Sequence, residues 1–323
     1  MGGSFGDIAG IAAGAALATS GGEERTIRRK GKGSAIKMSE IREAASEFVA
    51  EARTLAADRR FLHWEAAFPG VWTDWESNEP SGGFDSVIGN PPWDRMKLQE
   101  VEWFAARVPE IAHAARAADR KRRIETIHKR RDPVAAAYDR ASWIAETAVR
   151  VARDSGAYPL LSGGDINIYS LLVERAMRLV REDGIVGLLV PSGIAADMGA
   201  AKFFRSVSTG GRLGALLDFE NRRNSLGLGP FFPDVDSRFK FCALIAGGAR
   251  RHFAQALCAF FQQDADAAEA SAFALTPEDF SAVNPNTGTA PVFRSRRDAD
   301  IALGIYRRLP VLVDRRGAEA KSV

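Results

Sequence analysis

The tetrapeptide Asn90-Pro91-Pro92-Trp93 contains the residue types in this chain that are best suited to chemistry. The Asn side chain and the backbone carbonyl that follows it offer two hydrogen-bond acceptors side by side, and the Trp ring offers a flat surface for stacking. A planar base that carries an exocyclic amino group fits two acceptors beside a ring. We therefore predict that this tetrapeptide binds a nucleobase of that kind.

The tetrapeptide directly follows a short apolar run, residues 84–89, which predicts a β-strand. Two consecutive prolines prevent either a strand or a helix from continuing, so Asn90 and Trp93 are expected at a rigid strand end. Open α/β sheets bind their ligands at the carboxyl ends of strands. The tetrapeptide therefore lies where such a sheet is expected to bind a ligand, in agreement with its predicted binding of a base.

The rest of the chain alternates between helical and strand patterns. The predicted strands are residues 84–89, 185–190, 213–219 and 238–246. The predicted helices are residues 39–60, 165–183 (ended by Gly184) and 200–207, with a long helical insertion over residues 97–160. This alternation predicts an open, doubly wound α/β sheet with helices on both faces.

Composition limits the class of protein. The chain has 323 residues, of which 46% are hydrophobic and 26% charged, as in soluble globular proteins. Its two cysteines, Cys242 and Cys258, lack metal-ligand spacing and are too few for a disulfide framework, so we predict a cytoplasmic protein without a metal site. The apolar stretch 8–18 is too short to cross a membrane, and no membrane anchor is predicted. Residues 1–40 are expected to be a loose segment, residues 41–250 the core and residues 251–323 a carboxyl-terminal extension.

The chain resembles the adenine-specific, amino-methylating DNA methyltransferases that use S-adenosylmethionine, in particular the type IIG and related phage-defence restriction–modification enzymes. The resemblance covers roughly residues 60–316. The motifs that carry it are residues 61–69, 84–93, 164–169, 190–195, 218–221, 231–238, 284–287 and 293–298. It implies the Rossmann-like fold of S-adenosylmethionine-dependent methyltransferases.

The resemblance also implies a role for each residue of the tetrapeptide. Asn90 and the carbonyl of Pro91 would accept hydrogen bonds from the N6 amino group of adenine, and Pro92 would stiffen the loop. Trp93 would stack on the base after it is flipped out of double-stranded DNA. The methyl group would pass directly from S-adenosylmethionine to N6, without a covalent enzyme intermediate. Asp85, in the preceding strand, is the one candidate cofactor-binding residue.

One part of the family pattern is missing. The family binds its cofactor with a glycine-bearing loop after a first strand, upstream of the tetrapeptide, and the sequence shows no such loop. Gly10 and Gly14 follow no strand pattern and have no acidic partner at a suitable spacing. The chain is therefore similar to the catalytic middle of such an enzyme, with an incomplete sheet.

Two alternatives follow from this gap, and a third has a separate basis. In the first, a partner chain or a missing segment supplies the cofactor loop and the target recognition. In the second, the chain is a catalytically inert fragment or a DNA-binding subunit. In the third, the fold is the same but the substrate is RNA or protein, because similar loops serve those reactions.

Lys and Arg are dense between residues 116 and 131. The favoured interpretation is a solvated helical face, because acidic residues lie nearby. In the alternative, basic side chains of this run contact DNA phosphates. The candidates for such contacts are Arg120, Arg122, Arg123, Lys129 and Arg130.

Overall fold

The structure, a computed structural model, describes residues 26–27, 36–60, 62, 64–73, 81–309, 311, 313–314 and 321–322. It divides into two compact units, Met1–Pro69 and Gly70–Val323. In the first unit, β1 (Thr26–Ile27) pairs with β2 (Ile36–Lys37), and two helices follow, α3 (Met38–Arg59) and α4 (Trp64–Ala67). Helix α3 confirms the helix predicted over residues 39–60. Most of the predicted loose segment 1–40 lies outside the described residues.

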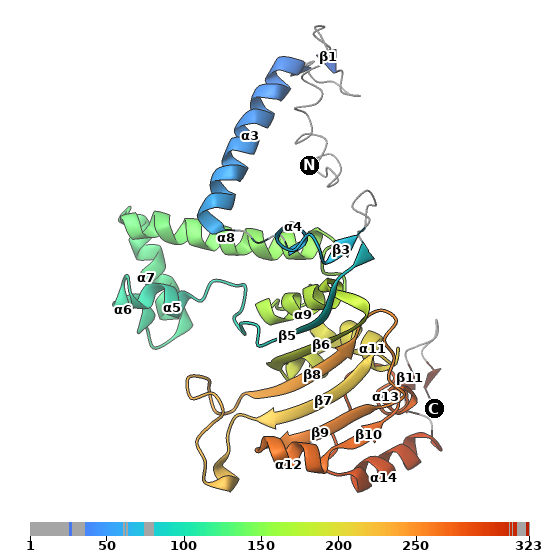
Figure 1. Cartoon of the computed structure of the whole chain (residues 1–323). Coiled ribbons are helices and arrows are strands. Elements are labelled where there is room, and N and C mark those ends of the chain that lie inside the picture. The colour runs from blue at the N-terminus through green and yellow to red at the C-terminus, as the bar shows by residue number, and fades with distance from the viewer. Residues whose placement is uncertain are drawn as a thin grey trace. The chain divides into compact units, whose positions relative to one another are not determined.

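The second unit is built on a six-stranded sheet with the strand order β10-β9-β7-β8-β6-β5 (Figure 1). Its strands are β5 (Phe84–Gly89), β6 (Val180–Pro191), β7 (Leu213–Glu220), β8 (Lys240–Gly247), β9 (Ala256–Gln262) and β10 (Phe273–Leu275). Strand β5 runs parallel to β6, and β7 runs parallel to β9, whereas β8 is antiparallel to both of its neighbours. The predicted α/β class is confirmed, and all four predicted strands are present.

Helices pack mainly on one face of this sheet. They are α9 (Ile168–Leu179), α11 (Ala201–Ser208), α13 (Pro277–Val283) and α14 (Arg296–Tyr306). Their apolar side chains, such as Val173 and Phe204, share the main core with Leu244 and Cys258 from the strands. On the opposite face, α12 (Ala265–Ser271) packs through Ala268 against a smaller cluster at the carboxyl end of β7.

The predicted helical insertion lies between β5 and α9 and consists of four helices. They are α5 (Glu100–Ala105), α6 (Pro109–Ala112), α7 (Ala117–Lys129) and α8 (Pro133–Asp154). A separate small core of Phe104, Ile111, Ala112 and Ile124 holds them together. Asp132 starts α8 by accepting a hydrogen bond from the Val134 amide.

The remaining elements are short. They are β3 (Trp72–Thr73), β4 (Ser81–Gly82), α10 (Gly193–Ala196), the 3-10 helices Met198–Ala200 and Asn224–Leu226, β11 (Val313–Asp314) and β12 (Lys321–Ser322). None of the helices in the described ranges is long and apolar enough to cross a membrane. Within the same ranges, no three His, Cys, Asp or Glu side chains are grouped so that they could hold a metal ion.

The predicted end of the helix over residues 165–183 is wrong. Helix α9 ends at Leu179, and Val180 already has extended backbone angles, φ −79° and ψ 140°. Gly184 lies inside β6 and does not cap the helix. A Cβ at Gly184 would lie 2.5 Å from Val180 Cγ2 and 2.7 Å from the carbonyl oxygen of Asp85. The glycine is therefore required by the close approach of β5 to β6.

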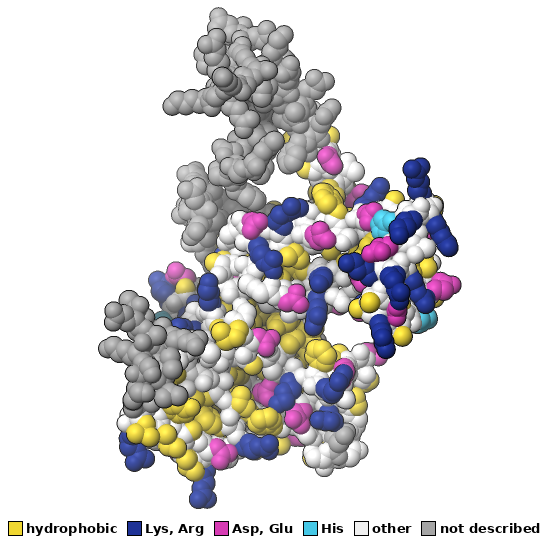
Figure 2. Space-filling model, turned by 180° about the vertical axis from the view of Figure 1, so that it is seen from behind, with side chains coloured by type: hydrophobic (Ala, Val, Ile, Leu, Met, Phe, Trp, Pro, Cys, Tyr) yellow, Lys and Arg dark blue, Asp and Glu magenta, His cyan; other side chains and the backbone are white. Residues whose placement is uncertain are grey.

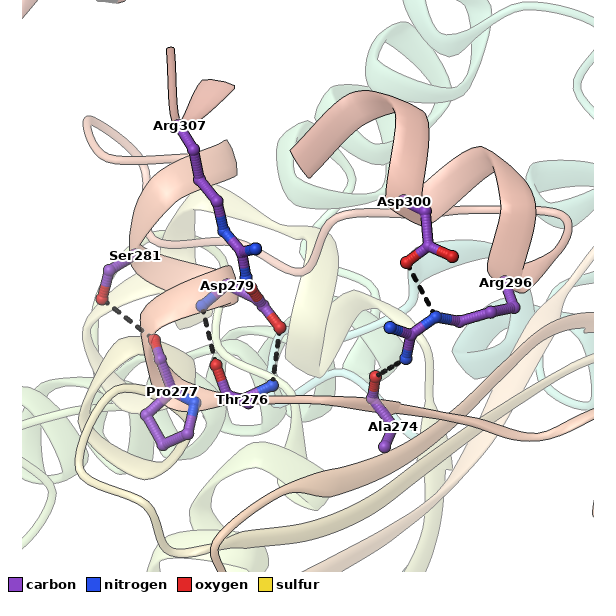
Figure 3. Close-up of polar contacts among 8 residues, drawn as sticks. All are labelled: Ala274, Thr276, Pro277, Asp279, Ser281, Arg296, Asp300 and Arg307. Atoms are coloured by element: carbon purple, nitrogen blue, oxygen red, sulfur yellow. Dashed lines mark hydrogen bonds and ion pairs between the residues drawn. The ribbon is translucent and has the colours of Figure 1, made fainter. Parts of the chain in front are cut away.

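One polar interaction caps α13, and two others tie α14 to α13 and to β10 (Figure 3). Thr276 and Asp279 form a capping box at the start of α13. Arg307, just after α14, donates to the buried Asp279 carboxylate at 2.5 Å. Arg296 donates to the carbonyl of Ala274 in β10 at 2.9 Å.

Candidate functional site

The tetrapeptide lies directly after the last residue of β5, at the carboxyl end of the strand. The side chain of Asn90 is exposed, and the ring of Pro91 is half-buried. Among the described residues, none donates a hydrogen bond to the Asn90 amide oxygen or to the Pro91 carbonyl. Both acceptors are therefore available to a ligand.

Trp93 is fixed in place by three contacts, two with the sheet and one with the loop between β7 and β8. Its indole N–H donates to the carbonyl of Leu189 in β6 at 3.4 Å. Its ring packs edge-on against Phe232, with centroids 5.1 Å apart, and lies 6.0 Å from the ring of Phe241. The ring is half-buried, so part of its surface stays open to a ligand.

The loop between β7 and β8 supplies Phe232, and Asn221 holds this loop in shape. The Asn221 side chain is 1% exposed and accepts a hydrogen bond from the Phe232 amide at 2.8 Å. It also donates to the carbonyls of Phe232 and Val235 at 3.0 and 3.1 Å. Asn221 therefore positions the ring that contacts Trp93.

The structure also brings together two of the motifs noted in the sequence. The residues that follow the tetrapeptide run beside the start of α9, where Arg95 forms a backbone bridge with Asn167. The Ile168 amide donates to the carbonyl of Asp94 at 2.8 Å, and the Met96 amide donates to that of Ile166 at 3.2 Å. These bonds fix the carboxyl side of the Asn90–Trp93 loop.

A groove of about 640 Å³ begins at the tetrapeptide. Trp93, Asp94 and Arg95 form one part of its wall, and Trp103 of α5 and Ala145 of α8 form another. The groove thus joins the indole ring to the helical insertion. A neighbouring cavity of about 680 Å³ lies between α8 and the segment before α5.

A polar cluster around Asp218 lies at the carboxyl ends of the parallel strands, the same end of the sheet as the tetrapeptide. Asp218 is buried and accepts hydrogen bonds from the Ser192 hydroxyl and, at 3.3 Å, from the Phe261 amide. Lys240 Nζ lies 3.7 Å from the Asp218 carboxylate and 3.9 Å from that of Glu220. The cluster thus joins the ends of three strands, β6, β7 and β9, to the start of β8.

Phe261 has a backbone conformation that is rare for a bulky residue, with φ of 60°. Two cations lie over its ring, Lys240 Nζ at 3.9 Å and Arg294 Cζ at 5.0 Å from the centroid. Among the described residues, Arg294 has no carboxylate partner and is exposed. Lys240 and Phe261 were missed by the sequence analysis. A single lysine at the start of an otherwise apolar strand was the available signal for Lys240.

Asp85 lies near the amino end of β5, at the opposite end of the strand from Asn90. Its carboxylate is 85% exposed and lies 3.0 Å from Arg181 Nε. At ~3.3 Å per residue, the five residues from Asp85 to Asn90 span about 16 Å. The structure therefore does not bring Asp85 to the tetrapeptide, and its cofactor role stays a prediction.

The predicted phosphate-contacting residues lie on and just after α7, which packs on α6 and α8. Arg120 binds Glu100 at 2.8 Å, Arg122 binds Asp119, and Arg123 binds the carbonyl of Glu110. The other two candidates, Lys129 and Arg130, are exposed and have no carboxylate partner in the described ranges. Figure 2 shows Lys and Arg side chains of the helical insertion mixed with Asp and Glu, as the favoured interpretation of a solvated face expects.

Two tyrosines, Tyr169 in the main core and Tyr138 in the wall of the 680 Å³ cavity, stay protonated at neutral pH. Burial, with the nearby Asp197, raises the pKa of Tyr169 to about 12. Burial, with Glu100, also raises the pKa of Tyr138 to about 12. Burial raises the pKa of the Cys242 and Cys258 thiols, so neither thiol is a ready nucleophile.

No protein-family model and no curated protein matches the chain. Its backbone is similar to parts of several larger solved structures. One is a complex of DrdV with DNA, 14% identical, with 75% of this chain and 17% of that chain covered and a TM-score of 0.29. A second is the type I restriction–modification methyltransferase subunit from Streptococcus thermophilus, 11% identical, with 73% and 34% covered and a TM-score of 0.28.

A third is the ATP-dependent type ISP restriction–modification enzyme LlaBIII bound to DNA, 7% identical, with 55% and 10% covered and a TM-score of 0.31. The chain spans between a tenth and about a third of the length of these three proteins. Similarity at this level does not place the chain in any of their families.

Proposed function

We propose that this chain forms the adenine-binding half of a DNA methyltransferase that methylates adenine N6 in a restriction–modification or related defence system. One observation carries the proposal. No described residue donates to the amide oxygen of Asn90 or to the carbonyl of Pro91, two acceptors at the carboxyl end of β5, next to a Trp93 ring fixed by Leu189 and Phe232. Double-stranded DNA with one adenine flipped out is the proposed substrate.

In this proposal, the tetrapeptide binds and orients the base. The two N–H groups of the N6 amino group donate to the Asn90 side chain and the Pro91 carbonyl, which favours a tetrahedral, more nucleophilic nitrogen. The ring of Trp93, backed by Phe232, provides the apolar surface against which the base lies. These residues therefore contribute positioning and electrostatic stabilisation.

S-adenosylmethionine is the proposed methyl donor, and the described residues do not fit a site for it. The described strands upstream of β5 have two residues each, and none leads through a glycine loop into a helix. Asp85 is paired with Arg181 at the far end of β5. We therefore assign no step of the transfer to this chain beyond binding the base.

Product analysis tests the proposal. The full chain, alone and together with the polypeptides encoded next to it, is incubated with labelled S-adenosylmethionine and DNA of mixed sequence. The DNA is then digested to nucleosides. The expected product is N6-methyladenine. Label found only in cytosine, or only in RNA or protein added as competitors, would overturn the adenine assignment.

A second candidate is a catalytically inert fragment or DNA-binding subunit, favoured by the lack of a cofactor site among the described residues. Lys129 and Arg130, which are exposed, are its most available phosphate contacts. Calorimetric titration of the isolated chain with S-adenosylmethionine tests the fragment directly. Tight binding would exclude the inert fragment, since the chain would then hold its own donor.

A further inference from the structure

Residues from three separate motifs of the sequence meet around Phe261, at the carboxyl end of β9. The Ser192 hydroxyl and the Phe261 amide both donate to the carboxylate of Asp218. Lys240 Nζ lies 3.9 Å and Arg294 Cζ lies 5.0 Å from the centre of the Phe261 ring. We call these five residues the Phe261 cluster. The tetrapeptide needs none of them to bind a base, so their meeting has a separate cause.

The backbone at Phe261 is held in an unusual conformation. Its φ is 60°, in the left-handed region that a bulky residue rarely adopts. The register of β9 on β7 shifts at this point, where β9 has two residues opposite the single Asp218, so Phe261 belongs to a β-bulge. Bulges re-aim side chains and are common beside binding sites, and such strain persists only where the surroundings hold it. Here the hydrogen bond from the Phe261 amide to Asp218 holds it, and the ring lies against two cations.

The Phe261 cluster lies beside the base-binding loop. Its members follow or end β6, β7 and β9, whose carboxyl ends lie where open α/β sheets bind their ligands. The Ser192 amide donates to the carbonyl of Lys240 at 3.1 Å. Phe241, the next residue in β8, has its ring 6.0 Å from that of Trp93. The cluster and the tetrapeptide are therefore neighbours at one end of the sheet.

The two cations of the cluster have N–H groups without hydrogen-bond acceptors among the described residues. Lys240 Nζ lies 3.7 Å from the carboxylate of Asp218 and 3.9 Å from that of Glu220, which is an ion-pair distance but too long for a hydrogen bond. Arg294 is exposed, and no described residue accepts a hydrogen bond from its guanidinium group. A guanidinium group has five N–H donors and an ammonium group has three. The cluster therefore offers several donors to a ligand.

The carboxylates of the cluster are less accessible than its cations and are already bound. The Asp218 side chain is 10% exposed and accepts the two hydrogen bonds described above, whereas the Lys240 side chain is 35% exposed. Glu220 accepts a hydrogen bond from Gln263 Nε2 at 2.8 Å. The carboxylates thus hold the Lys240 ammonium group in place, and the accessible charges, on Lys240 and Arg294, are positive. The ligand that fits is an anion with several oxygens.

Arg294 is held in place by the residues on either side of it. Phe293 is buried in the main core, and the Ala290 amide donates to the carbonyl of Ala195 at 2.8 Å. Ser295, directly after Arg294, caps the start of α14. A fixed backbone and a ring beside the guanidinium group reduce the entropy that is lost when this group binds a ligand.

We infer that Lys240 and Arg294 bind a phosphate group of the DNA backbone beside the flipped adenine. Lys and Arg are the usual partners of backbone phosphates, and such contacts position the DNA without reading its sequence. DNA as the source of the phosphate rests on the proposed function. The phosphate contact is thus placed on the sheet, whereas the sequence pointed only to the basic run of the helical insertion.

The test measures binding of the full chain to a fluorescein-labelled DNA duplex of mixed sequence, by fluorescence anisotropy over a range of salt concentrations. The variant is Arg294→Gln, which folds normally because the side chain is exposed and donates to no described residue. The matched control is Arg297→Gln on α14, which removes the same charge from another exposed side chain. A second variant, Lys240→Gln, removes the other cation of the cluster. The melting temperature of each variant is measured alongside.

Each phosphate contact contributes about 0.9 to the slope of log K against log salt concentration. Arg294→Gln should therefore lower this slope by about one, and Lys240→Gln should lower it by a similar amount. Arg297→Gln should leave the slope unchanged. An unchanged slope in Arg294→Gln, equal losses in Arg294→Gln and Arg297→Gln, or no binding of the wild type to DNA would each overturn the inference.

The two proposals fail in different ways. N6-methyladenine formed at the wild-type rate by Arg294→Gln, with an unchanged salt slope, would contradict the phosphate site and leave the proposed function in place. A slope that is lowered in Arg294→Gln, with methyl transfer only to cytosine, RNA or protein, would contradict the proposed function and leave the phosphate site in place.

Discussion

Asn221 and Phe232 are joined by a reciprocal pair of hydrogen bonds, in which the Phe232 amide donates at 2.8 Å and the Asn221 amide group donates back at 3.0 Å. Phe232 in turn packs edge-on against Trp93. A buried asparagine at the end of β7 thus sets the position of the ring that the proposed base would contact. Asn221 itself is 1% exposed, so it supports Phe232 and is not positioned to contact a ligand.

Replacing Asn221 with Ala should destabilise the protein by about 2–3 kcal/mol, because it removes the partners of three backbone groups in the loop. Urea unfolding followed by tryptophan fluorescence measures this change. Arg222→Ala, at the exposed neighbouring position, should change the free energy of unfolding by less than about 0.5 kcal/mol. Equal effects of the two variants would show that the loop does not depend on Asn221.

Gly184→Ala should separate β5 from β6 locally, since the new Cβ would lie 2.5 Å from Val180 Cγ2 and 2.7 Å from the Asp85 carbonyl. We expect a loss of about 2 kcal/mol or more in the free energy of unfolding, as for other overpacked sites. Gly229→Ala is the control, because nothing lies within 4 Å of its Cβ. Thermal unfolding of the two variants side by side checks the prediction, and a Gly184→Ala protein as stable as the control would contradict it.

The helical insertion should lose stability in acid through Glu100. The hydrogen bond from Arg120, with a second from Tyr138, lowers the pKa of Glu100 below its usual 4.5. A carboxylate with a lowered folded pKa contributes stability above its unfolded pKa, and this contribution is lost as pH falls through the folded pKa. Glu100→Gln should therefore lower the melting temperature at neutral pH, and the difference from the wild type should shrink below pH 4.5.

The matched control for this acid effect is Glu102→Gln, in the same turn of α5 and exposed. Its melting temperature should follow that of the wild type at every pH. If the difference in melting temperature between the wild type and Glu100→Gln stayed constant from neutral pH into acid, the loss of stability in acid would not be due to Glu100.

Asp279 should anchor the carboxyl-terminal helices. Its carboxylate accepts from the Thr276 amide at 2.9 Å and from Arg307 at 2.5 Å while it is itself buried. Asp279→Ala should cost about 2 kcal/mol or more, because a helix cap and a partly buried ion pair are lost together. Chemical denaturation measures the loss, with Glu278→Ala, exposed in the same turn, as the control. An equally small effect of both variants would contradict the anchoring role.

The parts of the fold that the sequence predicted are those governed by local patterns. Continuous apolar runs correctly predicted β6, β7 and β8 because strands buried in a sheet need apolar residues throughout. Gly184 was wrongly predicted to cap a helix, since a glycine that caps a helix and one that allows strands to approach look alike in sequence. Only the register of β5 on β6 separates the two cases.

The contacts of the candidate site depend on pairing between distant strands. Asp218 meets Ser192 and the Phe261 amide only because β7 lies in the same sheet as β6 and β9. The spacing of these residues along the chain does not indicate which of them are in contact, so Lys240 and Phe261 could not be predicted as neighbours. The tetrapeptide was recognisable because its four residues are consecutive.

In the proposed reaction, Asn90 binds the amino group that receives the methyl group. The decisive measurement is the rate of N6-methyladenine formation by Asn90→Ala, in whichever preparation, isolated chain or complex, is active. We expect the rate to fall by at least about 100-fold, as for other lost donors or acceptors at a reacting group, while the melting temperature stays unchanged because the side chain is exposed. Gln255→Ala, exposed between β8 and β9, should keep the full rate. An Asn90→Ala protein that methylates adenine as fast as this control would contradict the account.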